Sequence, residues 1–284
     1  MASIVGGFIM PHEPGVFYMP KEKWNDAQNR VRAAYEAVGK RIGELGATSV
    51  IVIGADHYVL FGPGCLPSYL IGIGDVSGPY ERFPDIAQSD IPNNTALALH
   101  IAQYGGAHGF DWAVAKTLRV DHSIGVPARL CALSNDSVKG VVPVYLASGV
   151  EPLLPMRRAH ELGRMMGDAV KAWPADERVA VIGSGGISHW VGLPEMGKVN
   201  ETFDRWVLDC VTRGDAEAML KLSDAEVFEQ GGNGAWEIRN FLCMMGALGD
   251  QPGSIIAYEQ GPQWVTGLGF AEVHAAGVAE ATTA

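Results

Sequence analysis

Five side chains of this sequence have the types and positions that suit metal-dependent chemistry. Four of them are histidines that close or follow short apolar runs, and such runs predict buried strands: His12, His57, His122 and His189. In an α/β protein the residues just past the strand ends gather at one edge of the sheet, where ligands bind. Glu237 lies among apolar neighbours in GGNGAWEIRNFL, where an unpaired buried carboxylate would be costly. The set predicts a metal site with acid–base groups beside it.

Each of these residues also has a simpler structural interpretation. His12 in MPHEPG fits a surface turn, and His57 fits an ordinary histidine at a strand end. His122 belongs to an Asp-His dipeptide, which is a weak motif by itself. Glu237 fits a salt bridge with Arg239 as well as it fits a metal ligand. Only a meeting of these residues in space favours the metal site.

Other motifs near the histidines exclude or add functions. The turn GSGGIS before His189 lets backbone amides approach a ligand closely. It is neither GxGxxG nor a P-loop, and no GxSxG occurs, which argues against nucleotide binding and against a nucleophile elbow. Asp56, beside His57, is a candidate acceptor that orients a neighbouring imidazole. The remaining histidines are interpreted as structural or solvated: His100, His108, His160 and His274.

Two histidines and one carboxylate are the usual ligand set of a non-haem Fe(II) site that binds substrate and O₂ in its open positions. Zinc uses the same ligand types in hydrolases. Two further histidines favour iron, because cleavage of a chelated diol needs a base for a phenolic proton and an acid near the oxygen. From the residues alone, both metals stay open.

Composition narrows the class of protein. The chain has 284 residues, 48% hydrophobic content and a formal net charge of −11, which argues against nucleic acid and anionic membranes as partners. No apolar stretch approaches the ~20 residues of a membrane span, and the start resembles no signal peptide. The four cysteines form no CxxC pair, as expected for free thiols in the cytoplasm.

Strand and helix patterns alternate without a break in composition, which predicts one α/β domain over residues 1–275 and a flexible tail over 276–284. A long surface excursion is expected at 75–93, and 121–133 reads as a loop leading into a helix. Strands are expected at 2–9, 49–53, 68–74, 110–115, 141–148, 178–185, 254–260 and 264–273. Helices are expected at 31–45, with Asn25 or Asp26 as the cap before it, and at 95–105, 154–173, 199–214, 215–222 and 234–249.

The segments that carry the five candidate residues resemble the class III extradiol ring-cleavage dioxygenases, specifically the protocatechuate 4,5-dioxygenase catalytic (beta) subunit superfamily. The resemblance runs in order from about residue 5 to residue 270. Its most specific part is GSGGISHWVGLPEMGKVNETFDRWVLD, and GNGAWEIRNFLCMMGALG matches the family's glutamate helix. The other matching segments are PHEPG, VIVIGADHYVLF and VDHSIGVP. Pro11 departs from the family, since many relatives carry a small polar residue there.

The resemblance implies a fold and a set of roles. It implies a central mixed β-sheet flanked by helices, with Fe(II) held by His12, His57 and Glu237. It implies His189 as the base that takes a proton from the diol, and His122 as an acid or hydrogen-bond donor. The best-known member uses a small separate alpha chain to cover its site, and no such domain is fused here. A homo-oligomer covered by the 75–93 excursion, or a complex with an alpha-type subunit, is therefore expected.

The expected reaction is extradiol cleavage of a catechol, with insertion of both atoms of O₂. A carboxylate on the ring is expected, as in protocatechuate or a gallate relative, with Arg119, Lys116 and Arg129 as candidate partners for that charge. A dihydroxypyridine (hydroxypyridone) or an aminophenol is the competing substrate. A zinc-dependent hydrolase and a non-catalytic binding protein remain as alternatives from other classes.

Overall fold

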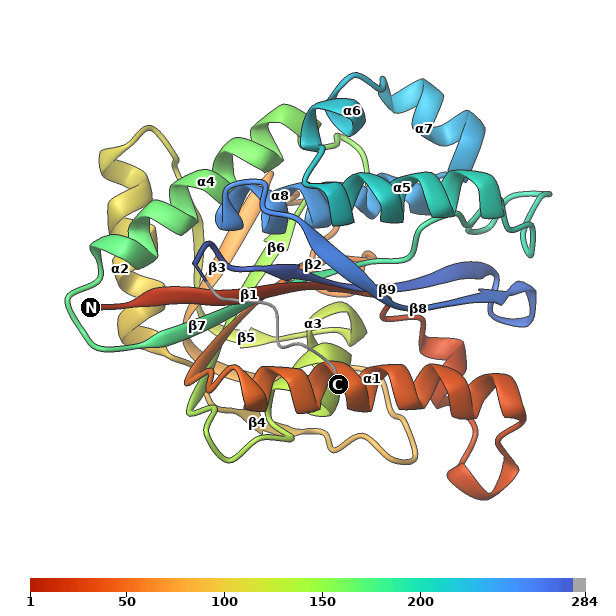
Figure 1. Cartoon of the computed structure of the whole chain (residues 1–284), viewed down its shortest axis with the longest axis horizontal. Coiled ribbons are helices and arrows are strands. Elements are labelled where there is room, and N and C mark those ends of the chain that lie inside the picture. The colour runs from red at the N-terminus through yellow and green to blue at the C-terminus, as the bar shows by residue number, and fades with distance from the viewer. Residues whose placement is uncertain (278–284) are drawn as a thin grey trace.

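A computed structural model of the chain describes residues 1–277, so the expected tail falls almost entirely outside the described residues. Within these residues the strands form one mixed sheet in the order β4-β3-β6-β2-β7-β1-β9-β8, with β5 paired to β3 (Figure 1). Strands β6, β2, β7 and β1 run parallel to one another. The pairs β4–β3, β3–β6, β1–β9 and β9–β8 are antiparallel, and β5 pairs parallel to β3. The strands are β1 (Ser3–Met10), β2 (Ser49–Ala55), β3 (Tyr69–Gly78), β4 (Ser89–Ile91), β5 (Ala113–Arg119), β6 (Gly140–Leu146), β7 (Arg178–Ser184), β8 (Gly253–Gly261) and β9 (Thr266–His274).

Helices cover both faces of this sheet (Figure 1). One face carries α2 (Thr95–Ala107), α4 (Met156–Ala172), α5 (Glu201–Arg213) and α8 (Ile238–Leu248), with α6 (Ala216–Leu220) and α7 (Asp224–Gly231) further out. The other face carries α1 (Asp26–Glu44), α3 (His122–Pro127) and the π-helical turn η3 (Ala128–Ala132). Four short 3₁₀ turns complete the elements: η1 (Pro14–Phe17), η2 (Lys21–Lys23), η4 (Gly234–Glu237) and η5 (Pro262–Trp264).

The central strand β2 is buried on both faces of the sheet, which is why its sequence is an unbroken apolar run. Its alternate side chains point to opposite faces of the sheet. Ile51 and Ile53 join the core under α4 and α8, whereas Val50 and Val52 join the core under α1. All four are fully buried, as expected for a parallel strand covered on both sides. The α/β class and the mixed central sheet are thus confirmed.

The structure differs from the expected elements at three places. Strand β3 continues to Gly78 and β4 lies within the expected excursion, so only about 79–88 forms an irregular surface segment. The stretch after Asp121 is helical from its first residue, because the Asp121 carboxylate accepts a hydrogen bond from the Ser123 amide and caps α3. Helix α7 was not expected; a capping box at Ser223 starts it.

No helix within residues 1–277 combines the length and the apolar character needed to cross a membrane.

Candidate metal centre and substrate cavity

The five predicted residues lie together beyond the carboxyl ends of adjacent strands. His12 follows β1 by two residues, His57 follows β2 by two, and His189 lies in the turn after β7, which pairs with both β1 and β2. His122 is the first residue of α3, and Glu237 ends η4 directly before α8. Segments from the whole length of the chain therefore converge on one edge of the sheet.

Glu237 is the centre of the cluster. Its Oε1 lies 3.2 Å from His12 Nε2 and 3.1 Å from His57 Nε2. The His122 ring stacks on His57 with 4.5 Å between centroids and lies 5.3 Å from His12. Ligand atoms of these three histidines all fall within 4.8 Å of one another. Such a concentration of imidazole nitrogen and carboxylate oxygen can hold a divalent metal ion.

Both histidines that contact Glu237 are oriented through their other ring nitrogen. His12 Nδ1 lies 2.8 Å from Ser184 Oγ, at the end of β7. His57 Nδ1 lies 2.8 Å from Asp121 Oδ2, and Asp121 is fully buried. A carboxylate or hydroxyl on the far nitrogen is the usual support of a metal-ligating imidazole, because it fixes the ring orientation and the tautomer.

His122 has the same kind of support from the excursion. Its Nδ1 donates to Oε1 of Glu81 at 2.7 Å, and Glu81 lies in the irregular segment after β3. The other oxygen of Glu81 is buried without a hydrogen-bond partner in the structure. No motif of the sequence pointed to Glu81, because the contact spans 41 residues and joins a surface segment to a helix start.

The glycine-rich turn after β7 holds Glu237. The Gly186 amide donates to Glu237 Oε2 at 2.8 Å. A Cβ on Gly186 would lie 2.7 Å from Cε1 of His189, and a Cβ on Gly234 would lie 2.1 Å from Nε2 of the same ring. Glycine is therefore required on both sides of the His189 imidazole. The turn was expected to approach a ligand closely, but its backbone approaches the side chains of Glu237 and His189.

His189 faces the same carboxylate from further away. Its Nε2 lies 3.9 Å from Glu237 Oε2, and its Nδ1 donates to the Ile187 carbonyl at 3.3 Å. Burial lowers the pKa of His189, so its neutral form is favoured. With Nδ1 carrying the proton, Nε2 has a free lone pair, as a general base needs.

The electrostatics of the cluster favour positive charge around one carboxylate. Burial alone would raise the pKa of Glu237, but the charge and hydrogen bond of His12, with those of His57, hold it well below its usual range. Burial has the opposite effect on a histidine and would lower the pKa of His57. Its hydrogen bonds to Asp121 and Glu237 nevertheless hold that pKa well above its ordinary value. The site thus keeps an ionised carboxylate ready for a cation.

A cavity of about 510 Å³ opens beside the cluster. Glu13 is its other acidic lining residue; Oε1 of Glu13 accepts from the Gly15 amide at 2.8 Å, and burial raises its pKa to about 6. The rest of the lining is apolar or uncharged: Pro14, Tyr58, Gly149, Val150, Gly186, Val191, Met196, Asn233, Gly234, Val265 and Thr266. The volume suits a single-ring aromatic molecule.

Backbone strain accompanies this cavity. Tyr58 and Val265 both line it, with φ of 58° and 61°. Positive φ is unusual for a non-glycine residue, and it is a genuine outlier for β-branched valine. Strain of this kind concentrates at ligand sites, where the surrounding structure enforces it.

The cationic residues expected to hold a substrate carboxylate lie elsewhere, so that part of the sequence prediction is wrong. Arg119 stacks on the Tyr80 ring at 4.6 Å, and Lys116 is exposed on β5. Arg129 donates to backbone carbonyls of Gly78, Ser89 and Asp90. None of the three lines the cavity.

Two other expected partnerships are replaced. Asp56 accepts from the amides of Leu60 and Phe61, so the carboxylate that orients His57 is Asp121. Arg239 pairs with Asp224 and does not neutralise Glu237. The structure therefore gives no support to the salt-bridge interpretation of Glu237.

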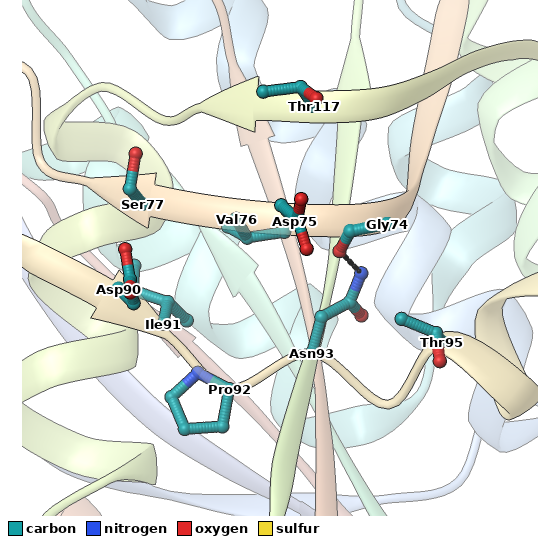
Figure 2. A pocket seen from close by; sticks show the side chains of 10 residues that line it. All are labelled: Gly74, Asp75, Val76, Ser77, Asp90, Ile91, Pro92, Asn93, Thr95 and Thr117. Carbon is teal, nitrogen blue, oxygen red and sulfur yellow. Dashed lines mark hydrogen bonds between the residues drawn. The ribbon is translucent and has the colours of Figure 1, made fainter.

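A second hollow, of about 650 Å³, lies beside β3, β4 and β5 (Figure 2). Asn93 lines it and donates to the Gly74 carbonyl at 2.9 Å. An isolated β-bridge joins Asn93 to Val141, near the start of β6. The hollow therefore lies near the start of a strand, whereas the histidines follow the ends of strands. This hollow holds no histidine, and although it is larger, its chemistry does not make it the metal centre.

Comparison with known proteins identifies the family of this chain. Residues 6–269 match the family described as the catalytic LigB subunit of aromatic ring-opening dioxygenase, and the chain belongs to that family. It is similar to proteins named 2,3-dihydroxyphenylpropionate/2,3-dihydroxicinnamic acid 1,2-dioxygenase. The Paraburkholderia phymatum protein is 28% identical, covering 93% of this chain and 96% of the relative. The Cupriavidus necator protein is 28% identical over 86% and 90%, and the Rhodococcus jostii protein 25% identical over 84% and 89%.

The chain is accordingly an extradiol ring-cleavage dioxygenase. The donor set fits a metal ion of the kind such enzymes use, because two imidazole nitrogens and one carboxylate oxygen converge in a buried pocket that stays open toward the cavity.

Proposed function

We propose that this enzyme depends on non-haem Fe(II), held by His12, His57 and Glu237, and opens the ring of a catechol with both atoms of O₂ entering the product. The observation that carries the proposal is the position of Glu237 Oε1, 3.2 and 3.1 Å from the Nε2 atoms of the two histidines. Fe(II) held by these residues would supply Lewis-acid and redox chemistry for a diol and O₂.

His189 is proposed as the base for one catechol hydroxyl. Its Nδ1 proton is engaged by the Ile187 carbonyl, which leaves Nε2 free to accept the proton. His122 is proposed as the acid or hydrogen-bond donor to substrate or oxygen. Its Nδ1 donates to Glu81, so a proton carried on its other nitrogen is the one available to the cavity. Both rings line the cavity.

The substrate ring is the finer part of the proposal. The sequence analysis expected a carboxylate-bearing catechol such as protocatechuate or a gallate relative, and the relatives' names contain a propionate. Dihydroxypyridines and aminophenols present the same pair of adjacent donors and are the competing rings. Oxygen uptake by the ferrous protein against all three ring types ranks them.

The metal assignment is tested on protein loaded with ferrous iron without oxygen. We expect oxygen uptake and a yellow ring-fission product from a catechol, and loss of both iron and turnover in His57→Ala and Glu237→Ala. His108→Ala is the matched control, because His108 is exposed and bonds only the Tyr104 carbonyl. Full iron content and turnover in the two ligand variants would show the assignment to be wrong.

The same protein distinguishes the zinc alternative. Zinc uses this ligand set in hydrolases. Stoichiometric zinc in protein purified without added metal, together with turnover that ferrous iron does not increase, would overturn the Fe(II) assignment. A homo-oligomer, or a complex with an alpha-type subunit, stays a prediction that light scattering of the active protein measures.

A further inference from the structure

The outer wall of the cavity is apolar, which the names of the chain's relatives do not suggest. Val150, Val191, Met196 and Val265 supply apolar surface around the opening, with Pro14 beside Glu13. Val191 and Met196 are each about half exposed, at 51% and 56%. A ring held by its hydroxyls at the metal cluster would direct its other substituents toward this wall.

Apart from the histidines of the metal cluster, the described lining of the cavity offers no cation to a substituent. Among its described lining residues none is lysine or arginine, and the charged groups besides the histidines are Glu13 and Glu237. Glu13 supplies no positive charge that could neutralise a second carboxylate. Only Oε1 of Glu13 is occupied, by the Gly15 amide, which leaves Oε2 as a further acceptor.

The neutral polar lining residues are Tyr58, Asn233 and Thr266, and none of them supplies a positive charge. Asn233 uses both ends of its amide on the backbone of Val191, accepting from N at 2.8 Å and donating to O at 3.0 Å. The hydroxyl of Thr266 donates to the Gly267 carbonyl. A carboxylate moved into this space loses part of its hydration and gains no counter-ion, which disfavours its binding. A neighbouring carboxylate adds repulsion.

We propose that the substrate is a catechol whose ring substituent carries no negative charge, and that Glu13 is a specificity-determining residue that disfavours carboxylates. The inference rests on the proposed function, and it separates this chain from relatives named for a dihydroxyphenylpropionate. The uncharged substituent packs against Val150, Val191 and Met196. A hydrogen-bond donor on it is tolerated or favoured, because Oε2 of Glu13 can accept.

Pairs of catechols that differ only in charge test the proposal. Suitable pairs are 3-(2,3-dihydroxyphenyl)propionate with its primary amide, and protocatechuate with 3,4-dihydroxybenzamide. Dissociation constants are measured on the ferrous full-length protein without oxygen, and kcat/KM by oxygen uptake in air. We expect the amide to be favoured about tenfold or more in both quantities, the equivalent of ~1.4 kcal/mol. Equal values, or preference for the carboxylate, would overturn the proposal.

Two substitutions test the named residues. Glu13→Gln keeps the shape of the side chain and removes its charge, so the preference for the amide is expected to shrink about threefold or more. Met196→Arg adds a cation to the wall and is expected to shift the preference toward the carboxylate about tenfold. Met196→Gln is its uncharged control, since packing losses common to both variants cancel in the ratio. An unchanged ratio in Glu13→Gln would remove Glu13 from the proposal.

The outcomes separate the two proposals. Oxygen uptake with preference for the carboxylate overturns the charge inference and leaves the dioxygenase function standing. Tighter anaerobic binding of the amide without any oxygen uptake supports the charge inference and contradicts the proposed function. A ferrous protein that binds neither member of either pair contradicts both.

Discussion

Two buried aspartates support the two halves of the site, and their environments are opposite. Asp121 and Asp204 are both fully inaccessible to solvent, and each accepts a tyrosine hydroxyl at 2.8 Å, from Tyr145 and Tyr258 respectively. Asp121 caps α3 and orients His57. Asp204, on α5, accepts from the Ser188 amide at 2.8 Å and so anchors the turn that carries His189.

The pKa values of the two carboxyls move in opposite directions. Burial raises the pKa of Asp204 to about 6, because its partners are neutral donors. Burial also acts on Asp121, but the hydrogen bond from His57 and the charges of His122 and His57 outweigh it and lower the pKa. The comparison shows that burial alone does not assign a role. The carboxylate that faces imidazoles supports a cation site, and the one without them is structural.

Removing the charge of Asp121 is expected to have the largest effect. Asp121→Asn cannot offer His57 Nδ1 a carboxylate acceptor, and loss of such an outer support lowers metal affinity about 10–100-fold. Iron affinity is measured by competition with a chelator. Asp56→Asn is the matched control, because Asp56 is adjacent to His57 in sequence but bonds only backbone amides. Equal losses in the two variants would contradict the distinction between them.

Removing the charge of Asp204 is expected to change the pH dependence of stability. An Asp has a pKa of about 3.9 when unfolded, so between about pH 4 and pH 6 the folded protein binds more protons and its stability falls as pH rises. The penalty remains above pH 6. The free energy of unfolding of Asp204→Asn, relative to wild type, should therefore be about 1–2 kcal/mol higher at pH 7.5 than at pH 4, as measured by urea denaturation.

The control for that experiment lies on the same helix. Asp209→Asn removes a carboxylate from an exposed position of α5, where it pairs with Arg213. A gain in Asp209→Asn equal to that in Asp204→Asn would show that net charge, and not burial of Asp204, causes the change.

The smallest expected effect is the difference in stability cost between removing the Tyr145 hydroxyl and removing the Tyr258 hydroxyl. Tyr145 donates to Asp121 and accepts from the Asp121 amide at 2.9 Å, so Tyr145→Phe leaves a buried N–H without a partner. That costs about 1–3 kcal/mol, whereas Tyr258→Phe removes one hydrogen bond from a half-buried tyrosine and costs about 1 kcal/mol. Urea denaturation of both variants measures the difference. A larger loss in Tyr258→Phe would reverse the order of the two supports.

Several features of the fold were predictable because they depend on local pattern. The apolar run of β2 requires burial on both faces, and the Asn25 capping box starts α1 where expected. The excursion was only partly predictable, because β4 forms by pairing with β3 and has little apolar pattern of its own. Helix α7 was missed for a similar reason: its short sequence buries only Val227 and Gly231.

The supports of the site could not be predicted from sequence. His12 meets Ser184 across 172 residues, His57 meets Asp121 across 64, and His122 meets Glu81 across 41. A serine at a strand end or a glutamate in a surface segment has no periodicity that distinguishes it. The positions of the expected cations could not be predicted for the same reason: Arg129 is near His122 in sequence but donates to the backbone carbonyls of Ser89 and Asp90.

By itself the sequence determined which residues could do chemistry and that three of the histidines would reach one edge of the sheet. Apolar strand runs that end in His12, His57 and His189 must bring those imidazoles to one edge, because parallel strands share the direction of their carboxyl ends. The tertiary structure decided how the residues are held and what surrounds them. The tautomers, the position of Glu237 between two imidazoles and the absence of a cation from the described cavity wall all depend on contacts between distant segments, which no local pattern encodes.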